Sequence, residues 1–493
     1  MNSKLRWKYA GWTLLLLSLV LLFALLSFRL IRGRRALDSV RMATEEVYVF
    51  SGYRVSEDQI RIALIRNDHS DVPIAYSLEF ANGGERTAGR RLRVECQRAG
   101  ECPAAFSPPC SLSGYVGTIR EPLMHGRNVS FVHLSTPQRS FRLAVRDVRI
   151  PPNSPKRAHR LGVCVQPVFA HADWPQFVQF FEYWLDAGAT KFFVYRESYS
   201  GEVQRIIDFY RANGRAQIEL IDWSKLPQRE SWSRSHFDPN DHWYRLEAGD
   251  VRFVAQSDLD ELFFVNSAPS LLEFLEWTAA RNPRMASLNF LSRRVRVPNY
   301  WDRIAHPSDF NFAALREVEF EREVFARELY SKNIYIPERV RTSLSSNQSI
   351  GLQVKRFDIH VRREAEVGGR PNETFVHLNV SVHDGLVLHF RRVDSDVFLW
   401  QESAYTTELE AMSQRLERNF LRRLQADRTG LIDTRPWPNV GAQMLALMEA
   451  CRNEQYERKM ERCYSLQPCD WSVRRAFAGR LEWFVAPNTW GVI

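Results

Sequence analysis

The sequence predicts an α/β fold with a parallel, doubly wound sheet, preceded by an all-β module and a membrane-spanning helix. Three observations carry this prediction. An uncharged apolar run lies near the N-terminus, alternating apolar and polar runs fill residues 45–155, and patterns of buried strand and helix alternate from residue 160 onward. With 493 residues, 45% of them hydrophobic, the chain is long enough to bury more than one core.

The apolar run at residues 9–28 (YAGWTLLLLSLVLLFALLSF) has the length that a helix needs to cross the hydrocarbon layer. A cleaved signal peptide is the alternative, but no small-x-small cleavage site follows. Four arginines come next instead: Arg29, Arg32, Arg34 and Arg35. We therefore expect an uncleaved single-pass anchor at 9–28, a cytoplasmic tail at 1–8 and a basic, polar stem at 29–44.

Cysteines and glycosylation acceptors indicate that the body of the chain lies in an oxidising lumen. Cysteines form two groups without histidines at metal-binding spacing, which favours disulfides over zinc and leaves the pairing open: Cys96, Cys102 and Cys110, and Cys451, Cys463 and Cys469. Cys164, in an apolar strand, is expected to be a buried thiol outside these groups. Four Asn-x-Ser/Thr acceptors agree with a lumen: Asn128, Asn347, Asn372 and Asn379.

The formal charge of +9 does not predict nucleic-acid binding. Lysines and arginines are scattered along the chain, and no RNP-like, zinc-finger or basic-helix pattern is present. A basic surface suits the phosphates of a nucleotide sugar, or an anionic glycan, equally well.

Residues 45–155 contain six short alternating runs separated by Asn, Gly, Pro and Asp, and they end at the proline-rich segment PPNSP. This pattern predicts an all-β, sandwich-like module. Two roles stay open for it, namely packing support for the next domain and carbohydrate binding.

Residues 160–393 read as the α/β domain. Buried strands are predicted at LGVCVQPVFA, TKFFVYRES and QIELIDW, with helices at DWPQFVQFFEYWLDAGA and EVQRIIDFYRANG between them. Asp173 is the expected N-cap of the first helix, and a glycine stands at the end of each helix. A ligand of such a sheet binds beyond the carboxyl ends of its strands.

An acidic cluster follows the next buried strand, in VRFVAQSDLDELFFV, where the ligand is expected. Asp258 and Asp260 provide hard oxygen ligands suited to Mn²⁺ or Mg²⁺ bound to a diphosphate. The alternative is that both aspartates cap backbone amides at a strand end. The position after two strand–helix units favours the metal site.

Four blocks in this order resemble glycosyltransferase family 92: PVFAHADWPQFVQFFEYWLDAGATKFFVY, VAQSDLDELFF, SKNIYIPERV and LVLHFRR. The resemblance spans residues 163 to about 393 and implies a type II Golgi membrane enzyme with a GT-A (Rossmann-like) fold. It further implies an inverting, metal-dependent transfer of galactose from UDP-galactose, in β linkage, to a glycan of a glycoprotein, glycolipid or polysaccharide. The chain departs from the family at Leu262, where phenylalanine is usual.

The resemblance also implies roles for individual residues. Asp258 and Asp260 would hold the cation, and His389 in LVLHFRR would complete its ligands, with a core histidine as the alternative. Lys332 and Arg391 would neutralise the departing diphosphate, or are ordinary surface charges. Tyr195 and Glu197, after the second strand, would bind the uridine or ribose.

Inversion requires a group that takes the proton of the acceptor hydroxyl. The candidates are Glu338, Asp358, His360 and Asp384, without a ranking among them. Glu261, beside the metal pair, is expected to support the site and not to act as the base.

Residues 394–493 are expected to form a helical, cysteine-containing cover on the catalytic domain, bordering the acceptor site. Trp471, Trp483 and Trp490 are expected to be packing residues, with stacking on sugar rings as the alternative. The sequence thus predicts a luminal β-galactosyltransferase that binds a membrane, a nucleotide sugar and a glycan. The same fold with another UDP-sugar donor, or a catalytically silent glycan-binding protein, is the alternative.

Overall fold

The computed structural model describes residues 46–493 with gaps at 67–69, 82–86, 88, 97–112, 150–156, 214–215, 226–242, 245–249, 297–300, 302–303, 323–330, 351, 362–374, 392–399, 403–404, 429, 433–434 and 458–466. Within these residues no helix is long and apolar enough to cross a membrane. The predicted tail, anchor and stem at 1–44 lie outside the described residues.

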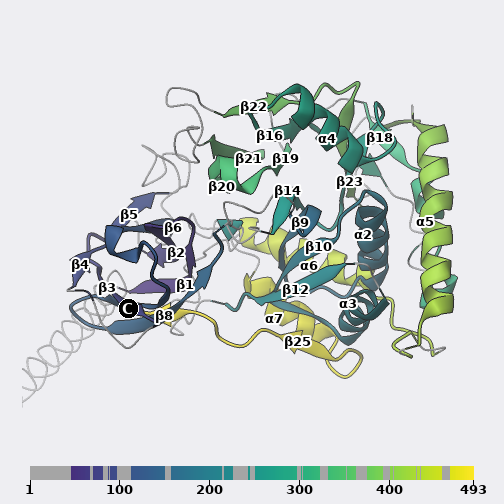
Figure 1. Ribbon diagram of the computed structural model, residues 1–493. Helices are drawn as coiled ribbons and strands as arrows, with labels where there is room; N and C mark the ends of the chain where they lie inside the picture. The colour runs from purple at the N-terminus through teal and green to yellow at the C-terminus, as the bar shows by residue number, and fades with distance from the viewer. Residues whose placement is uncertain are drawn as a thin grey trace, which may run out of the picture.

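The N-terminal module is a nine-stranded sheet with the order β4-β3-β7-β8-β1-β2-β6-β5, in which β26 also pairs with β1. Its strands are β1 (Val47–Arg54), β2 (Gln59–Arg66), β3 (Ala75–Phe80), β4 (Arg90–Arg91), β5 (Arg93–Cys96), β6 (Ser113–Arg120), β7 (Val129–Ser135), β8 (Ser140–Asp147) and β26 (Gly491–Val492), with a 3-10 turn η1 (Pro122–Met124). Apolar side chains of these strands form their own buried core. The last strand of the chain therefore completes the first module (Figure 1).

The second sheet is mixed and has the order β12-β10-β9-β14-β19-β16-β22. Its strands are β9 (His159–Val168), β10 (Lys191–Arg196), β12 (Gln217–Asp222), β14 (Val251–Ser257), β16 (Met285–Phe290), β19 (Lys332–Tyr335) and β22 (Val376–Asn379). Strands β9, β10, β12 and β14 run parallel to one another, as predicted. β19 runs antiparallel to β14 and β16, because the chain returns past the acidic turn before it joins the sheet.

A third sheet lies at the end of β14 and has the order β15-β23-β17-β18-β24. Its strands are β15 (Glu261–Val265), β17 (Ser292–Arg296), β18 (Glu319–Glu321), β23 (Gly385–Arg391) and β24 (Trp400–Glu402). Smaller elements are β11 (Ser198–Ser200) with β25 (Trp483–Val485), β13 (Trp243–Tyr244) with β20 (Val340–Ile350) and β21 (Leu352–Val361), and the 3-10 turns η4 (Pro307–Asp309), η5 (Ala313–Leu315) and η6 (Pro337–Arg339).

Among the described residues, helices pack on one face of the second sheet, whereas a doubly wound sheet was predicted. α2 (Trp174–Asp186) and α3 (Gly201–Asn213) bury alternate side chains of β9 and β10, among them Val163 and Phe192. The intervening side chains, such as Phe193, point to the other face and pack with Tyr48 of the β module. The β module thus occupies the position that a second layer of helices has in a doubly wound fold.

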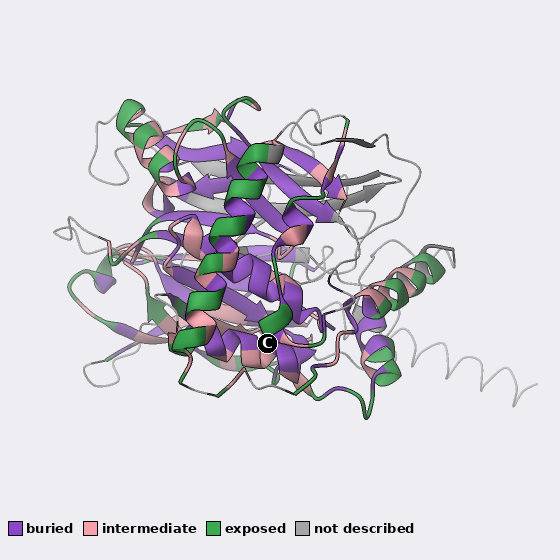
Figure 2. Cartoon of the chain, turned by 90° about the vertical axis from the view of Figure 1, so that its right-hand side faces the viewer, coloured by how far each residue is buried: buried purple, intermediate pink, exposed green. Residues whose placement is uncertain are grey.

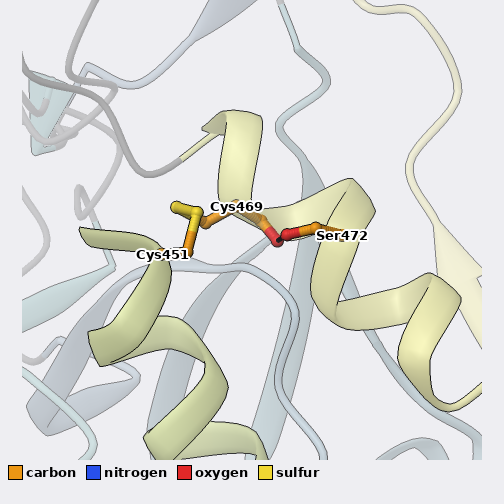
Figure 3. The surroundings of a disulfide bond; sticks show 3 residues. All are labelled: Cys451, Cys469 and Ser472. Atoms are coloured by element: carbon orange, nitrogen blue, oxygen red, sulfur yellow. Dashed lines mark hydrogen bonds between the residues drawn. A yellow bond between two sulfur atoms is a disulfide. The ribbon is translucent and has the colours of Figure 1, made fainter. Parts of the chain in front are cut away.

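The C-terminal part packs around this core. Its helices are α5 (Thr406–Ala426), α6 (Gly441–Glu457) and α7 (Gln467–Ala476); a further helix, α4 (Leu271–Arg281), follows β15. α5 lies along the surface with its exposed side outward (Figure 2). A disulfide between Cys451 and Cys469 joins α6 to α7 (Figure 3). Cys102, Cys110 and Cys463, and the side chain of Cys96, lie outside the described residues, and Cys164 is buried in β9.

The three C-terminal tryptophans lie in different environments. Trp490 is 5% exposed, contacts the rings of Phe50 and Trp223, and donates a hydrogen bond from Nε1 to the Ser224 carbonyl at 2.8 Å. Trp483 is half-buried in β25, whereas Trp471 is 57% exposed. Trp490 is therefore a packing residue between the β module and the second sheet.

We expect Trp490→Ala to lower the free energy of unfolding by about 3–5 kcal/mol, because it leaves a cavity and an unpaired Ser224 carbonyl. Trp471→Ala is the matched control and should change it by less than about 0.5 kcal/mol. Denaturant titrations followed by circular dichroism measure both. Equal losses for the two variants would contradict a structural role specific to Trp490.

Candidate active site

The acidic cluster forms a tight turn between β14 and β15. β14 is buried up to Ser257 except for the exposed Arg252, and the turn then brings Glu261 back as the first residue of β15. The Asp258 backbone N–H donates to Glu261 Oε2 at 2.9 Å, and the Ser257 hydroxyl donates to the Asp258 carbonyl at 2.9 Å. Local hydrogen bonds therefore fix the turn and leave the Asp258 and Asp260 carboxylates to make contacts elsewhere.

Lys332 compensates the charge of this turn. Its Nζ lies 3.0 Å from Asp258 Oδ2 and 2.9 Å from Glu261 Oε2, and its side chain is 1% exposed. Burial raises the pKa of Glu261 to about 7, with the Asp258 charge adding to the shift and Lys332 opposing it. Burial alone would lower the pKa of Lys332, but the two carboxylates outweigh it and raise that pKa.

Asp260 faces His389 instead. β15 pairs with β23 so that Glu261 stands opposite His389, and the Phe390 N–H donates to the Asp260 carbonyl at 2.7 Å. His389 Nε2 lies 3.1 Å from Asp260 Oδ2, and the histidine is 2% exposed. This register holds the imidazole and the carboxylate side by side at the carboxyl end of the second sheet.

The Asp260–His389 pair fits a divalent cation. Two ligands that bind one octahedral ion at about 2.1 Å in neighbouring positions lie roughly 3 Å apart, which is close to their observed separation. Asp258 lies against Lys332, and its predicted role as a further ligand of the cation stays a prediction. In the described part of the chain no three His, Cys, Asp or Glu side chains are grouped to hold an ion. The remaining ligands would have to come from the substrate or water.

A cavity of about 290 Å³ opens beside the acidic turn. One wall is the carboxyl end of β9 with the start of α2, residues 165–171, 173 and 176. Asp258, Leu259 and Asp260 form the second wall with Phe390. The third wall is α6, through Gly441, Met444, Leu445, Met448 and Glu449. The cavity lies where a parallel sheet binds its ligand.

Tyr195 and Glu197 lie outside the lining of this cavity. Tyr195 is 3% exposed and packs edge-on against Trp223. Glu197 is 1% exposed, and neither of its carboxylate oxygens has a hydrogen-bond partner in the described residues. Burial and then the nearby Asp470 charge raise the pKa of Glu197 to about 8. Their predicted contact with the nucleotide stays a prediction.

Two of the predicted proton acceptors, Glu338 and Asp384, have described side chains, and neither lines the cavity. Glu338 is ion-paired with Arg157 at 3.1 Å. Asp384 precedes β23 at the end opposite His389, and five strand residues span roughly 16 Å. The side chains of Asp358 and His360 in β21, and that of Arg391, lie outside the described residues.

The wall made by α6 was missed from the sequence. Its residues lie about 180 positions after the acidic turn, and nothing in their own pattern points to the cavity. The pairing of Lys332 with Glu261 was also missed. The available signal was that Asp258, Glu261 and Lys332 all stand in or next to apolar runs, because charges buried there need partners of opposite sign.

Three solved structures resemble parts of this chain. A mannosyltransferase from Pyrobaculum calidifontis in complex with GDP-Man and Mn²⁺ has a TM-score of 0.24 and 10% identity, over 67% of this chain and 90% of its own. TarS 1–349 of S. aureus in complex with UDP-GlcNAc has a TM-score of 0.25 and 11% identity, over 59% of this chain and 80% of its own. Glucosyl-3-phosphoglycerate synthase from Mycobacterium tuberculosis in complex with Mn²⁺, UDP and glucosyl-3-phosphoglycerate has a TM-score of 0.20 and 12% identity, over 55% of this chain and 82% of its own. No curated protein matches the chain.

The family match carries the assignment. The sequence model of glycosyltransferase family 92 matches residues 159–427, which are 269 of the 493 residues and include both the acidic turn and His389. The chain belongs to glycosyltransferase family 92.

Proposed function

We propose that this glycosyltransferase moves galactose from UDP-galactose, in β linkage and with inversion, to a glycan acceptor. The observation that carries the proposal is the Asp260–His389 pair, 3.1 Å apart at the edge of the sheet where nucleotides bind. Mn²⁺ is the proposed cation, with Mg²⁺ as the alternative, because carboxylate and diphosphate oxygens suit both ions and an imidazole is an unusual ligand for Mg²⁺. Galactose as the donor sugar follows from the family resemblance.

In this proposal the residues of the turn have separate tasks. Asp260 and His389 hold the cation, which when bound neutralises charge on the departing diphosphate. Lys332 is buried and holds Asp258 and Glu261, so the turn keeps its shape while the substrate enters.

We further propose that the chain is a single-pass type II protein of the Golgi membrane with its body in the lumen. The Cys451–Cys469 disulfide supports an oxidising compartment. Asn128 and Asn379, two of the glycosylation acceptors, are exposed, as a modified asparagine must be. The anchor at residues 9–28 is the proposed membrane segment.

We expect Asp260→Ala to abolish Mn²⁺-dependent UDP binding and to lower transfer from UDP-galactose at least about a hundredfold, because it removes a cation ligand. Calorimetry of the full chain with UDP, with and without Mn²⁺, measures the first effect. Release of UDP from a panel of UDP-sugars measures the second and identifies the donor.

Asp309→Ala, at an exposed aspartate of η4, is the control and should behave as wild type. Mn²⁺-dependent UDP binding that survives unchanged in Asp260→Ala would contradict the cation site. No binding or turnover with any donor in the wild type would favour the silent glycan-binding alternative.

Lys332→Met should destabilise the fold by about 3–5 kcal/mol, because it leaves Asp258 and Glu261 as uncompensated buried charges. Adding Glu261→Gln should restore part of this loss, since one of the two carboxylates is then neutral. The free energies of unfolding of both single variants and the double variant give the interaction energy between Lys332 and Glu261. An unchanged stability of Lys332→Met would mean that Lys332 acts only on the substrate.

A further inference from the structure

One stripe of α6 faces the cavity. The stripe follows the pattern i, i+3, i+4, i+7, i+8, the spacing of side chains on one side of a helix: Gly441, Met444, Leu445, Met448 and Glu449. The carboxyl end of β9, where the nucleotide of a parallel-sheet enzyme binds, lines the same cavity. The stripe therefore lines the cavity beside the nucleotide's expected position.

The helix is fixed in this place by three kinds of contact. The Ala172 N–H points at Met444 Sδ at 3.1 Å, and Met444 packs with Ala170. The Cys451–Cys469 disulfide, just beyond Glu449, ties α6 to α7 (Figure 3). α7 is in turn held by Asp470, which is 0% exposed and accepts a hydrogen bond from the Ser198 hydroxyl. The wall is thus built onto the catalytic sheet.

The chemistry of the stripe fits a nucleobase. Its middle is apolar and made of methionine and leucine, and a thioether makes favourable contacts with a flat aromatic ring. Its far end carries one carboxylate, Glu449, which can accept a hydrogen bond from a ring N–H. A glycan would need several polar groups or an aromatic platform, and the stripe has neither.

We propose that α6 closes over the uracil of the nucleotide donor, with Leu445 and Met448 against the ring and Glu449 accepting from the N3–H. This inference rests on the proposed function, because it assumes a UDP-sugar donor. It makes the cover helix, outside residues 159–427 of the family match, the element that selects the base.

The test is the binding of UDP to the full chain in Mn²⁺, without acceptor, measured by calorimetry. Met448→Ala should weaken UDP binding about tenfold by removing apolar contact with the ring. Met448→Leu should retain UDP binding because it keeps an apolar side chain of similar size. This variant distinguishes loss of contact with the ring from a general loss of folding. Glu449→Gln should reduce the preference for UDP over CDP, because the amide can also donate to N3 of cytosine.

Two changes on other sides of the same helix are matched controls. Leu447→Ala removes a side chain that is 40% exposed, and Glu454→Gln changes an exposed carboxylate; both should bind UDP as the wild type does. If Met448→Ala and Glu449→Gln keep the wild-type Kd and raise the KM for the acceptor, α6 faces the glycan and the inference is overturned. If the wild type binds no UDP, the proposed function itself fails.

Discussion

The buried contact of Lys332 with Asp258 and Glu261 is the constraint on which the site depends. Three charges lie at the junction of β14, β15 and β19, and each would be costly there without the others. Lys332 lies against Asp258 and Glu261, while His389 lies 3.1 Å from Asp260 through Nε2 and 3.8 Å from Glu261 through Nδ1. The pairing of β19 with β14 places the ammonium group of Lys332 beside the acidic turn.

Both faces of the second sheet are covered, one by helices and the other by residues from the N-terminal and C-terminal parts of the chain. Helices α2 and α3 cover one face, and side chains of the N-terminal module cover the other together with Trp490. The pairing of β26 with β1 then connects the two ends of the body directly (Figure 1). Packing support for the catalytic domain is consequently a physical role of the β module, whatever it binds.

The C-terminal cover contributes to the site as well as to stability. α5 packs Leu416 and Phe420 into the main core, and its Arg415 pairs with Asp186. α6 reaches the cavity itself. Residues outside the family match thus line the same cavity as the acidic turn.

The sequence by itself determined the elements whose signal is local. The strands β9, β10, β12 and β14, the helices α2 and α3, and the acidic turn are all visible in periodicity and in charge next to an apolar run. Tertiary structure decided the partners: Lys332 at Asp258, His389 at Asp260, the β module on the second face, and α6 across the cavity. The reason is physical, since periodicity reports which side of an element is buried, while the identity of what covers it depends on contacts between residues far apart in the chain.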